Sequence, residues 1–346
     1  MGRTPTTKLV ESVEQLSQEN INEHTPMGGN LLATGVGATF KIWAPNAQRV
    51  ALLWEYKKRA DGEWKPGKRG YLSQAADGLW NGFVPRMTSG DGYMFYIEGP
   101  EDGTKGLKRD PYARDLSDDP PWPQCFCLLY NPLTFPWHDQ NWTPPEFHKL
   151  VIYQLHIGTW RLSDSHPNGT FLDIIEYLPY LKALNINAIQ LLPIAEFPST
   201  FSSGYNGVDY FSPETDYGIK SNDAAINERL NKINALMADV DAALPSYSIE
   251  NIQGTANQLR MMVDMCHVFG IAVLLDVVYN HAGGGFGDKS IYFFDHQARG
   301  NNNDSLYFTD KGWAGGLVFA YWKNEVKQYL IENAKFLLTE CHCDGF

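Results

Sequence analysis

The sequence predicts an α/β protein in which a small β-sandwich precedes the first part of a (β/α)8 barrel. Two observations support this prediction. Short alternating apolar runs, separated by Asp-Gly turns, fill residues 28–115 with no sustained helical period. After Leu150 the pattern changes to apolar strands that alternate with amphipathic helices, which is typical of a parallel sheet.

Composition limits the classes of function that this chain can have. Of its 346 residues, 43% are hydrophobic and 20% are charged, which is an ordinary globular profile. The formal net charge of −12 disfavours binding to nucleic acid or to an anionic membrane surface. No apolar run reaches the ~18 residues of a membrane span, and the first residues lack the apolar core of a secretion signal. We therefore expect a cytoplasmic protein with no nucleic-acid or membrane partner.

The cysteines also favour a reducing compartment, because their number is odd and their spacing suggests no disulfide framework. Cys125 and Cys127 form one C-x-C pair, and Cys341 and Cys343 form another. Common zinc sites use C-x-x-C spacing, so a zinc site built from both pairs is the disfavoured alternative. Cys266 lies on an apolar helix stripe and is predicted to belong to the core.

Composition divides the chain into four segments. Residues 1–27 are polar and are predicted to form a flexible lead-in. Residues 28–115 hold the alternating strands and are predicted to fold as an immunoglobulin-like β-sandwich. Prolines crowd residues 116–148, which we interpret as a semi-rigid connector. Residues 149–346 carry the alternation of strand and helix that predicts the barrel.

The helices of the last segment are predicted from apolar stripes of helical period. Residues 171–185 carry one stripe, in which Pro179 is expected to introduce a kink. Residues 257–270 carry a second, which Gly270 is expected to end. The stripe residues are Ile174, Ile175, Leu178, Leu181 and Leu184, then Leu259, Met262, Val263 and Cys266, and in a third helix Val326, Tyr329, Leu330, Ala334 and Leu337.

Two inserts interrupt the alternation. Residues 220–255 contain an amphipathic stripe that we interpret as a helix packed on the barrel, with a site lid or a partner-binding helix as alternatives. Residues 283–320 are rich in Gly, Asn and aromatic residues, and long loops of this kind are usually functional. The stripe of the first insert consists of Ile226, Leu230, Ile233, Met237 and Val240.

Polar residues gather at the carboxyl ends of the predicted strands. His156 follows the first strand, Glu196 the second, and Asn280 and His281 the third. Active sites of parallel α/β proteins lie at this edge, and barrels draw residues from several successive strands there. A doubly wound nucleotide-binding sheet is the alternative, but no G-x-G-x-x-G or phosphate loop opens a helix. The pattern therefore favours a barrel.

Several segments of the chain resemble glycoside hydrolase family 13, the α-amylase family. DVVYNH (residues 276–281) is similar to the end of the family's third barrel strand. GYNGVDYFSPETDYG (residues 204–218) is similar to the Gly-Tyr loop after its second strand. VIYQLHIGTW (residues 151–160) resembles the first strand of its branching enzymes and trehalohydrolases. Upstream, FKIWAPNAQRVALL (residues 40–53) and DPYA (residues 110–113) resemble the family 48 carbohydrate-binding module.

This resemblance implies retaining hydrolysis or transfer at an α-glucosidic bond, with an α-glucan or maltooligosaccharide as substrate. One carboxylate attacks the anomeric carbon while a second, about 5–5.5 Å away, protonates the leaving oxygen. The implied activity is that of a 1,4-α-glucan branching enzyme of glycogen metabolism. A trehalohydrolase or debranching hydrolase of the same family is one alternative, and a non-catalytic glucan-binding protein is another.

The same resemblance places the catalytic nucleophile and the acid/base beyond Phe346, the last residue of this sequence. NEVKQYLIENAKFLLTECHCDGF (residues 324–346) is similar to the helix that leads into the family's fourth strand, where the nucleophilic Asp follows shortly after the Phe. We therefore expect an incomplete barrel with an exposed edge and a large apolar face, poor stability and no activity on its own. Asp276, Glu196 and Asp344 are not expected to replace the catalytic pair.

The resemblance also implies sugar-binding roles for residues that are present. Tyr205 is expected to stack on the glucose ring next to the scissile bond, and His281 to hydrogen-bond a hydroxyl of that sugar. Asp276 is expected to orient its neighbours through buried hydrogen bonds. Asn280 is a calcium ligand in many amylases, so calcium is the one cofactor left open, and no other cofactor is expected. Three tryptophans of the sandwich are candidates either for a glucan-binding surface or for the core: Trp43, Trp54 and Trp80.

Overall fold

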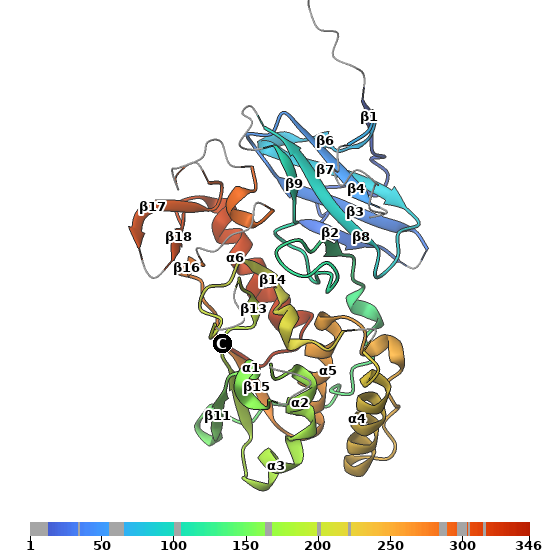
Figure 1. Ribbon diagram of the computed structural model, residues 1–346, viewed down its shortest axis with the longest axis vertical. Helices are drawn as coiled ribbons and strands as arrows, with labels where there is room; N and C mark the ends of the chain where they lie inside the picture. The colour runs from blue at the N-terminus through green and yellow to red at the C-terminus, as the bar shows by residue number, and fades with distance from the viewer. Residues whose placement is uncertain are drawn as a thin grey trace, which may run out of the picture.

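The computed structural model shows a β-sandwich, in blue at one end of Figure 1, and a second region with helices α3 and α4 at the opposite end. Residues 1–12 of the expected lead-in and parts of the loop 283–320 lie outside the described residues. The structure describes residues 13–33, 35–54, 66–99, 105–162, 168–198, 202–220, 223–283, 289–295, 303, 305–313 and 316–346.

Two sheets form the predicted sandwich, which is confirmed. One has the strand order β1-β5-β4-β8-β10, with β9 also paired to β8, and the other has the order β2-β3-β7-β6. Phe40 and Phe95 are fully buried and meet edge to face, with ring centroids 6.3 Å apart. The strands are β1 (Glu14–Gln15), β2 (Gly28–Leu31), β3 (Gly37–Trp43), β4 (Arg49–Trp54), β5 (Arg69–Tyr71), β6 (Ser73–Gln74), β7 (Leu79–Pro85), β8 (Gly92–Glu98), β9 (Gly106–Lys108) and β10 (Cys127–Leu128).

The sandwich includes segments that composition assigned elsewhere. β1 lies within the expected lead-in, and the Glu14 amide donates to the Lys68 carbonyl at 2.7 Å beside β5. β10 lies within the proline-rich connector and pairs with β8. Trp80 is buried and its indole donates to the Ala44 carbonyl at 2.9 Å, so it is a core residue and not a glucan-binding platform.

The second region is built on a parallel sheet of strand order β11-β12-β15. Adjacent strands follow chain order, whereas the order reverses at a switch point in a doubly wound sheet. A bridge between Leu274 and Gly345 places the following segment next to β15. This sequential order is the one expected at the opening of a (β/α)8 barrel. The strands are β11 (Ile152–Leu155), β12 (Ala188–Leu191) and β15 (Ala272–Leu275).

The two faces of this sheet differ in exposure. Leu191 and Leu275 are in register on one face and are buried. The other face is only partly covered: Ile152 is 44% exposed, whereas Ala188 and Ala272, in register with it, are buried. It also carries Gln154 and Gln190, in register with each other. Gln154 and Gln190 make this face of the sheet less apolar than we predicted from the sequence.

The helices follow the predicted stripes, with corrections at their ends. Pro179 is the second residue of a new helix, so the expected kink is a break between α2 and α3 at Tyr177. Gly270 follows α5 with φ +74, as predicted for a residue that ends a helix. Leu184 and Val240 are 47% and 46% exposed because they lie at the last turns of their helices, beyond the packed face. The helices are α1 (Ile157–Trp160), α2 (Phe171–Glu176), α3 (Leu178–Ala183), α4 (Ile226–Val240), α5 (Thr255–Val268) and α6 (Asn324–Thr339).

Two packing arrangements connect distant parts of the chain. Helix α4 of the first insert packs against α2 and α5, which agrees with its interpretation as a packed helix. Helix α6 runs through the middle of Figure 1, and its buried Tyr329 donates to the Pro111 carbonyl at 3.1 Å. No helix among the described residues is long and apolar enough to cross a membrane. The remaining strands are β13 (Ala195–Glu196) paired with β14 (Asp209–Pro213), and β16 (His281–Ala282), β18 (Leu317–Phe319) and β17 (Phe308–Trp313) in that order in one sheet.

Candidate functional site

The four residues predicted to bind substrate lie together beyond the carboxyl end of β15. The Tyr205 hydroxyl donates to Asp276 Oδ2 at 2.6 Å. His281 Nε2 lies 3.0 Å from the Tyr205 carbonyl oxygen, and Asn280 Nδ2 lies 3.4 Å from His281 Nδ1. A carbonyl oxygen only accepts, so Nε2 carries the proton of the neutral ring and Nδ1 faces the Asn280 amide as acceptor. The structure thus joins the Gly-Tyr loop to the end of the third strand.

Glycines permit this close approach of the two loops. Gly204 has φ +85, and a Cβ built there would lie 2.1 Å from the Pro193 carbonyl oxygen. A Cβ built on Gly283 would lie 2.1 Å from the Asn206 carbonyl oxygen. Both positions therefore exclude a side chain, and the loop that carries Tyr205 packs tightly on backbone from two directions.

The cluster is more exposed than the sequence analysis expected for Asp276. Tyr205 is 43% exposed and Asp276 is half-buried, because Asp276 comes directly after the last residue of β15 and reaches the rim of the sheet. Its partner is therefore a rim tyrosine and not a buried network. The hydrogen bond to Asp276 raises the pKa of Tyr205, with burial adding a smaller effect. The phenol stays protonated and donates, which leaves the tyrosine ring accessible.

Buried residues beneath the cluster fix its backbone. Tyr210 donates to the His281 carbonyl at 2.8 Å, and the Phe319 amide of β18 donates to the Asn280 carbonyl at 3.3 Å. A mostly apolar pocket lies in the same place, and its lining includes Gly204, Tyr210 and Asp276. The rim groups thus sit on a packed base, as a preorganised binding site requires.

His156 and Glu196, the other residues expected at strand ends, have separate environments. His156 has Tyr217 Oη and Thr159 Oγ1 at 2.8 and 3.0 Å from its two ring nitrogens, and it lines a different pocket. Burial lowers the pKa of His156. Glu196 is buried and its Oε2 accepts from the Thr215 amide at 2.8 Å. Neither residue contributes to the Tyr205 cluster.

Sequence reasoning missed a second buried carboxyl beside Glu196. Glu214 is also buried, and it accepts hydrogen bonds from the Phe197 amide at 3.0 Å and the Asp216 amide at 3.1 Å. Burial raises the pKa of Glu214 to about 8. Burial, followed by the charge of Glu214, raises the pKa of Glu196. The two residues flank the β13–β14 hairpin, and nothing in the spacing of the sequence indicates that they face one another.

Phe346, beyond which the nucleophile and the acid/base are expected, lies next to the sheet that carries the cluster. It follows Gly345, which forms a parallel bridge to Leu274 of β15. The Phe346 side chain is 51% exposed. The parallel bridge agrees with the expectation that this segment opens a fourth strand. The position of the catalytic pair beyond Phe346 stays a prediction.

The residues present do not fit the metals considered from the sequence. Within the described ranges, no group of three or more His, Cys, Asp or Glu side chains could hold a metal ion. All five cysteines are free and buried, and burial raises the thiol pKa of Cys125 to about 12 and of Cys341 to about 11. Asn280 is exposed and its amide faces His281, with no cluster of oxygen ligands described around it.

Comparison with known proteins agrees with the two-part architecture. Residues 26–113 match the carbohydrate-binding module 48 family (isoamylase N-terminal domain). The 1,4-alpha-glucan branching enzyme GlgB of Oleidesulfovibrio alaskensis is 30% identical over 319 residues, which cover 89% of this chain and 42% of that protein. GlgB of Hydrogenovibrio crunogenus is 29% identical over 325 residues, which cover 89% of this chain and 37% of that protein. The chain therefore spans less than half the length of the curated relatives it matches.

Solved structures share the fold. The pullulanase from Bacillus acidopullulyticus aligns with 94% of this chain and 38% of its own, with a TM-score of 0.67 and 21% identity. The GBS pullulanase SAP in complex with maltotetraose aligns with 93% of this chain and 41% of its own, with a TM-score of 0.65 and 20% identity. The resemblance read from the sequence is thereby confirmed as a similarity: residues 26–113 match the carbohydrate-binding module 48 family, the chain shares its fold with the solved pullulanases, and over most of its length it is similar to 1,4-alpha-glucan branching enzymes.

Proposed function

We propose that this chain carries the glucan-binding part of an enzyme that acts on α-1,4-glucans in the manner of a 1,4-α-glucan branching enzyme, and that the Tyr205 cluster contacts one sugar unit of the glucan. The observation that carries this proposal is the Tyr205–Asp276 hydrogen bond beside His281, at the carboxyl edge of the parallel sheet. The carbohydrate-binding module and the similarity to branching enzymes support the same substrate class.

The geometry suggests how a glucose unit is held. The accessible ring of Tyr205 offers an apolar face to the sugar, while its hydroxyl is fixed by Asp276 Oδ2. Asp276 Oδ1 is then the acceptor for a sugar hydroxyl. A second hydroxyl replaces the Asn280 amide or the Tyr205 carbonyl as the partner of His281. His281 thus keeps a hydrogen-bond partner when the sugar binds, which limits the cost of desolvation.

Retaining chemistry needs two carboxyl groups about 5–5.5 Å apart. The three carboxylates weighed from the sequence each have a different partner in the structure. Asp276 accepts from Tyr205, Glu196 from the Thr215 amide, and Asp344 from Trp142. We infer that these residues position and bind, and that they do not supply the catalytic pair.

An amylose assay tests this inference. The 346-residue chain is expected to leave both the iodine colour and the reducing ends of amylose unchanged. A fall in iodine colour without new reducing ends indicates transfer, whereas new reducing ends indicate hydrolysis as in a debranching or trehalose-releasing enzyme. Either kind of turnover above a buffer blank contradicts the assigned binding role.

Replacing Tyr205 tests the sugar contact. Tyr205→Ala removes both the ring and the bond to Asp276, and affinity for maltoheptaose at this site is expected to fall about tenfold, or ~1.4 kcal/mol. Tyr205→Phe keeps the ring and is expected to lose less. Calorimetric titration measures both variants, with Tyr180→Ala as the control because Tyr180 is 53% exposed on α3. Equal affinities for Tyr205→Ala and Tyr180→Ala contradict the contact.

A non-catalytic glucan-binding protein is the second candidate, favoured by the match of residues 26–113 to a carbohydrate-binding module. In that case the module alone retains glycogen, and Tyr205→Ala has no effect on retention. Binding of short maltooligosaccharides by the full chain separates the two functions, whereas both expect retention on glycogen. The branching-type proposal expects weaker retention of short maltooligosaccharides by the variant, while retention on glycogen persists through the module.

A further inference from the structure

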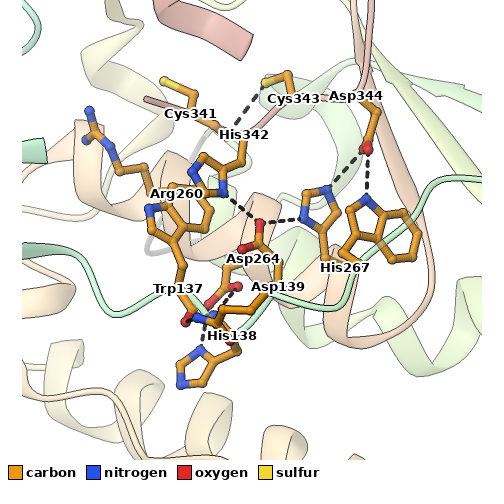
Figure 2. A network of polar contacts seen from close by, with 12 residues as sticks. Trp137, His138, Asp139, Arg260, Asp264, His267, Cys341, His342, Cys343 and Asp344 are labelled. Carbon is orange, nitrogen blue, oxygen red and sulfur yellow. Dashed lines mark hydrogen bonds and ion pairs between the residues drawn. The ribbon is translucent and has the colours of Figure 1, made fainter. Parts of the chain in front are cut away.

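A network of buried histidines and aspartates lies apart from the Tyr205 cluster, where the connector crosses the last turn of α5 (Figure 2). His267 of α5 stands at its centre. Its Nδ1 lies 3.1 Å from Asp139 Oδ2, and its Nε2 lies 3.0 Å from Asp344 Oδ2. The His267 side chain is 1% exposed, and those of Asp139 and Asp344 are 9% and 7% exposed. The three residues come from segments far apart in the sequence.

The hydrogen-bond geometry identifies the charge state of His267. A neutral imidazole has one N–H and one lone pair, so only one of its nitrogens can donate. Both nitrogens of His267 face carboxylate oxygens. Asp344 is committed as an acceptor, because Oδ1 takes the Trp142 indole N–H at 2.7 Å and Oδ2 takes the Val273 amide at 2.7 Å. A doubly protonated imidazolium satisfies both carboxylates at once.

The surroundings of His267 favour its positive charge. Trp142 stacks on the ring at 4.7 Å between centroids and 11° between planes. Burial lowers the pKa of His267, but the hydrogen bonds and charges of Asp139 and Asp344 outweigh burial and raise the pKa above its usual value. Burial raises the pKa of Asp139, and hydrogen bonds from His267 and His342 reverse this effect and lower it.

Further titratable groups surround this centre on each packed segment. His342 Nδ1 lies 2.7 Å from the same Asp139 oxygen and its ring stacks on Trp137 with centroids 3.7 Å apart. One turn earlier on α5, Asp264 Oδ2 lies 2.6 Å from Nδ1 of His138 in the connector, and the Pro245 carbonyl oxygen lies 2.8 Å from its Nε2, so this ring also faces acceptors at both nitrogens. Among the described residues, the titratable groups that face His267 or its partners are Asp139, Asp344, His342, Asp264, His138, Tyr247, Cys266 and Cys343.

The network determines where the segment after α6 lies. The Asp344 amide donates to the Val273 carbonyl at 2.8 Å, and the Leu275 amide donates to the Gly345 carbonyl at 3.0 Å. These bonds align residues 344–345 with β15. Asp276, the partner of Tyr205, is the next residue along that strand. The imidazolium therefore holds a segment whose register is shared with the strand that carries the sugar-binding cluster.

We propose that His267 is a positioning residue: a buried imidazolium that fixes the connector and the segment 341–346 against β15, and that releases them when it loses a proton. The positive charge of His267 follows from the geometry alone, whereas its effect on substrate binding rests on the proposed function. Loss of the proton leaves one nitrogen lone pair facing a buried carboxylate, so the network must break on one side. The consequence is a pH-dependent placement of the end of β15.

The sign of the pH dependence follows from the raised pKa. The unfolded chain loses the proton of His267 near pH 6.5, while the folded chain keeps it to higher pH. The stabilisation by His267 is complete below about pH 6.5 and is lost as the pH rises through the folded value. Across that interval the unfolding equilibrium constant is expected to rise by up to about tenfold per pH unit for this one proton.

Histidine NMR of the full chain tests the charge state directly. In protein labelled with 15N-histidine at pH 7.5, two rings are expected to show one-bond N–H couplings at both nitrogens: His267, and His138, whose nitrogens also both face acceptor oxygens. One of the two signals is absent from His267→Gln. Four other histidines with different exposure provide internal references in the same spectrum: His24, His148, His156 and His281. A neutral ring at His267 at pH 7.5 overturns the proposal, and this result does not depend on glucan activity.

A variant series tests the positioning role. His267→Gln is expected to lower the pH dependence of unfolding by up to one proton between pH 6.5 and 9, and His148→Gln, an exposed histidine of the connector, is expected to leave it unchanged. Maltoheptaose affinity of the wild-type chain is expected to fall over the same pH interval. If His267→Gln does not fold, the test uses the wild-type chain alone. Its maltoheptaose affinity is then measured over the pH range in which the His267 NMR signal titrates, and the two curves are compared. Parallel pH slopes for wild type and His267→Gln, or affinity that does not follow the His267 titration, contradict the role.

Discussion

Arg109→Met is expected to lower the free energy of unfolding by about 3–5 kcal/mol. The Arg109 side chain is fully buried, and it donates from Nε to Asp209 Oδ1 at 3.1 Å and from a second nitrogen to Asp209 Oδ2 at 2.9 Å. The Asp209 side chain is only 6% exposed. The variant therefore leaves a carboxylate in a desolvated site without its counter-charge, which costs more than the pair itself contributes.

Urea unfolding of three variants measures this effect. Arg109→Met combined with Asp209→Leu is expected to recover most of the loss, because no unpaired charge is then buried. Arg49→Met is the matched control: the Arg49–Glu98 pair is 43% and 17% exposed, so its loss is expected to cost ~1 kcal/mol or less. A cost for Arg109→Met as small as that of the control contradicts the reasoning.

The position of this ion pair gives it a role beyond stability. Arg109 follows β9 of the sandwich, and its amide donates to the Lys289 carbonyl at 2.8 Å. Asp209 begins β14, four residues after Tyr205. The pair thus joins the carbohydrate-binding module to the hairpin next to the sugar-binding cluster. Arg109→Met is therefore expected to weaken maltoheptaose binding as well as the fold, while Arg49→Met is expected to affect neither substantially.

Much of the fold was predictable because it depends on local periodicity. The alternation through Phe40 and Ile42 marks a strand whatever it pairs with, and the stripe through Leu259 and Met262 marks a buried helix face. Helix ends were less predictable. Val240 continues the stripe of α4 but is exposed, because the stripe identifies a face and contains no information on where the packing partner ends.

The candidate site could be predicted only where its residues belong to a recognisable motif. Tyr205, Asp276 and His281 were found through motifs that two short segments carry, and the structure places them in contact. The His267 network has no such signature, because its members lie 128 and 77 positions apart from His267 in the sequence. The connector's composition indicated only stiffness. Asp139, Trp137 and Trp142 of the connector join the network only through tertiary contacts, which no spacing rule in the sequence describes.

Glu214→Gln is expected to reduce the fall in stability that accompanies a rise in pH toward 8. The folded pKa of Glu214 is raised to about 8 by burial, whereas an unfolded glutamate titrates near 4.3. Between these values the folded chain holds a proton that the unfolded chain has lost, so the free energy of unfolding falls as pH rises. Glutamine has no carboxyl proton to lose, so the part of this pH dependence that Glu214 contributes disappears. At low pH the variant is expected to be less stable than the wild type. Each Glu214 oxygen accepts one backbone N–H, and in glutamine one of these two acceptors becomes an amide nitrogen.

Urea unfolding between pH 6 and 9 measures the change in slope, with Glu19→Gln as the control because Glu19 is exposed. Equal slopes for Glu214→Gln and Glu19→Gln contradict the buried protonated carboxyl. The hairpin that Glu196 and Glu214 close carries the Tyr205 loop between its strands, so ionisation of the pair is expected to disturb Tyr205 as well. Glu214→Gln should therefore remove part of the fall in maltoheptaose affinity as the pH rises, while the part that follows the His267 titration should remain. The same variant leaves the His267 imidazolium signal intact, which separates this carboxyl effect from that of the histidine network.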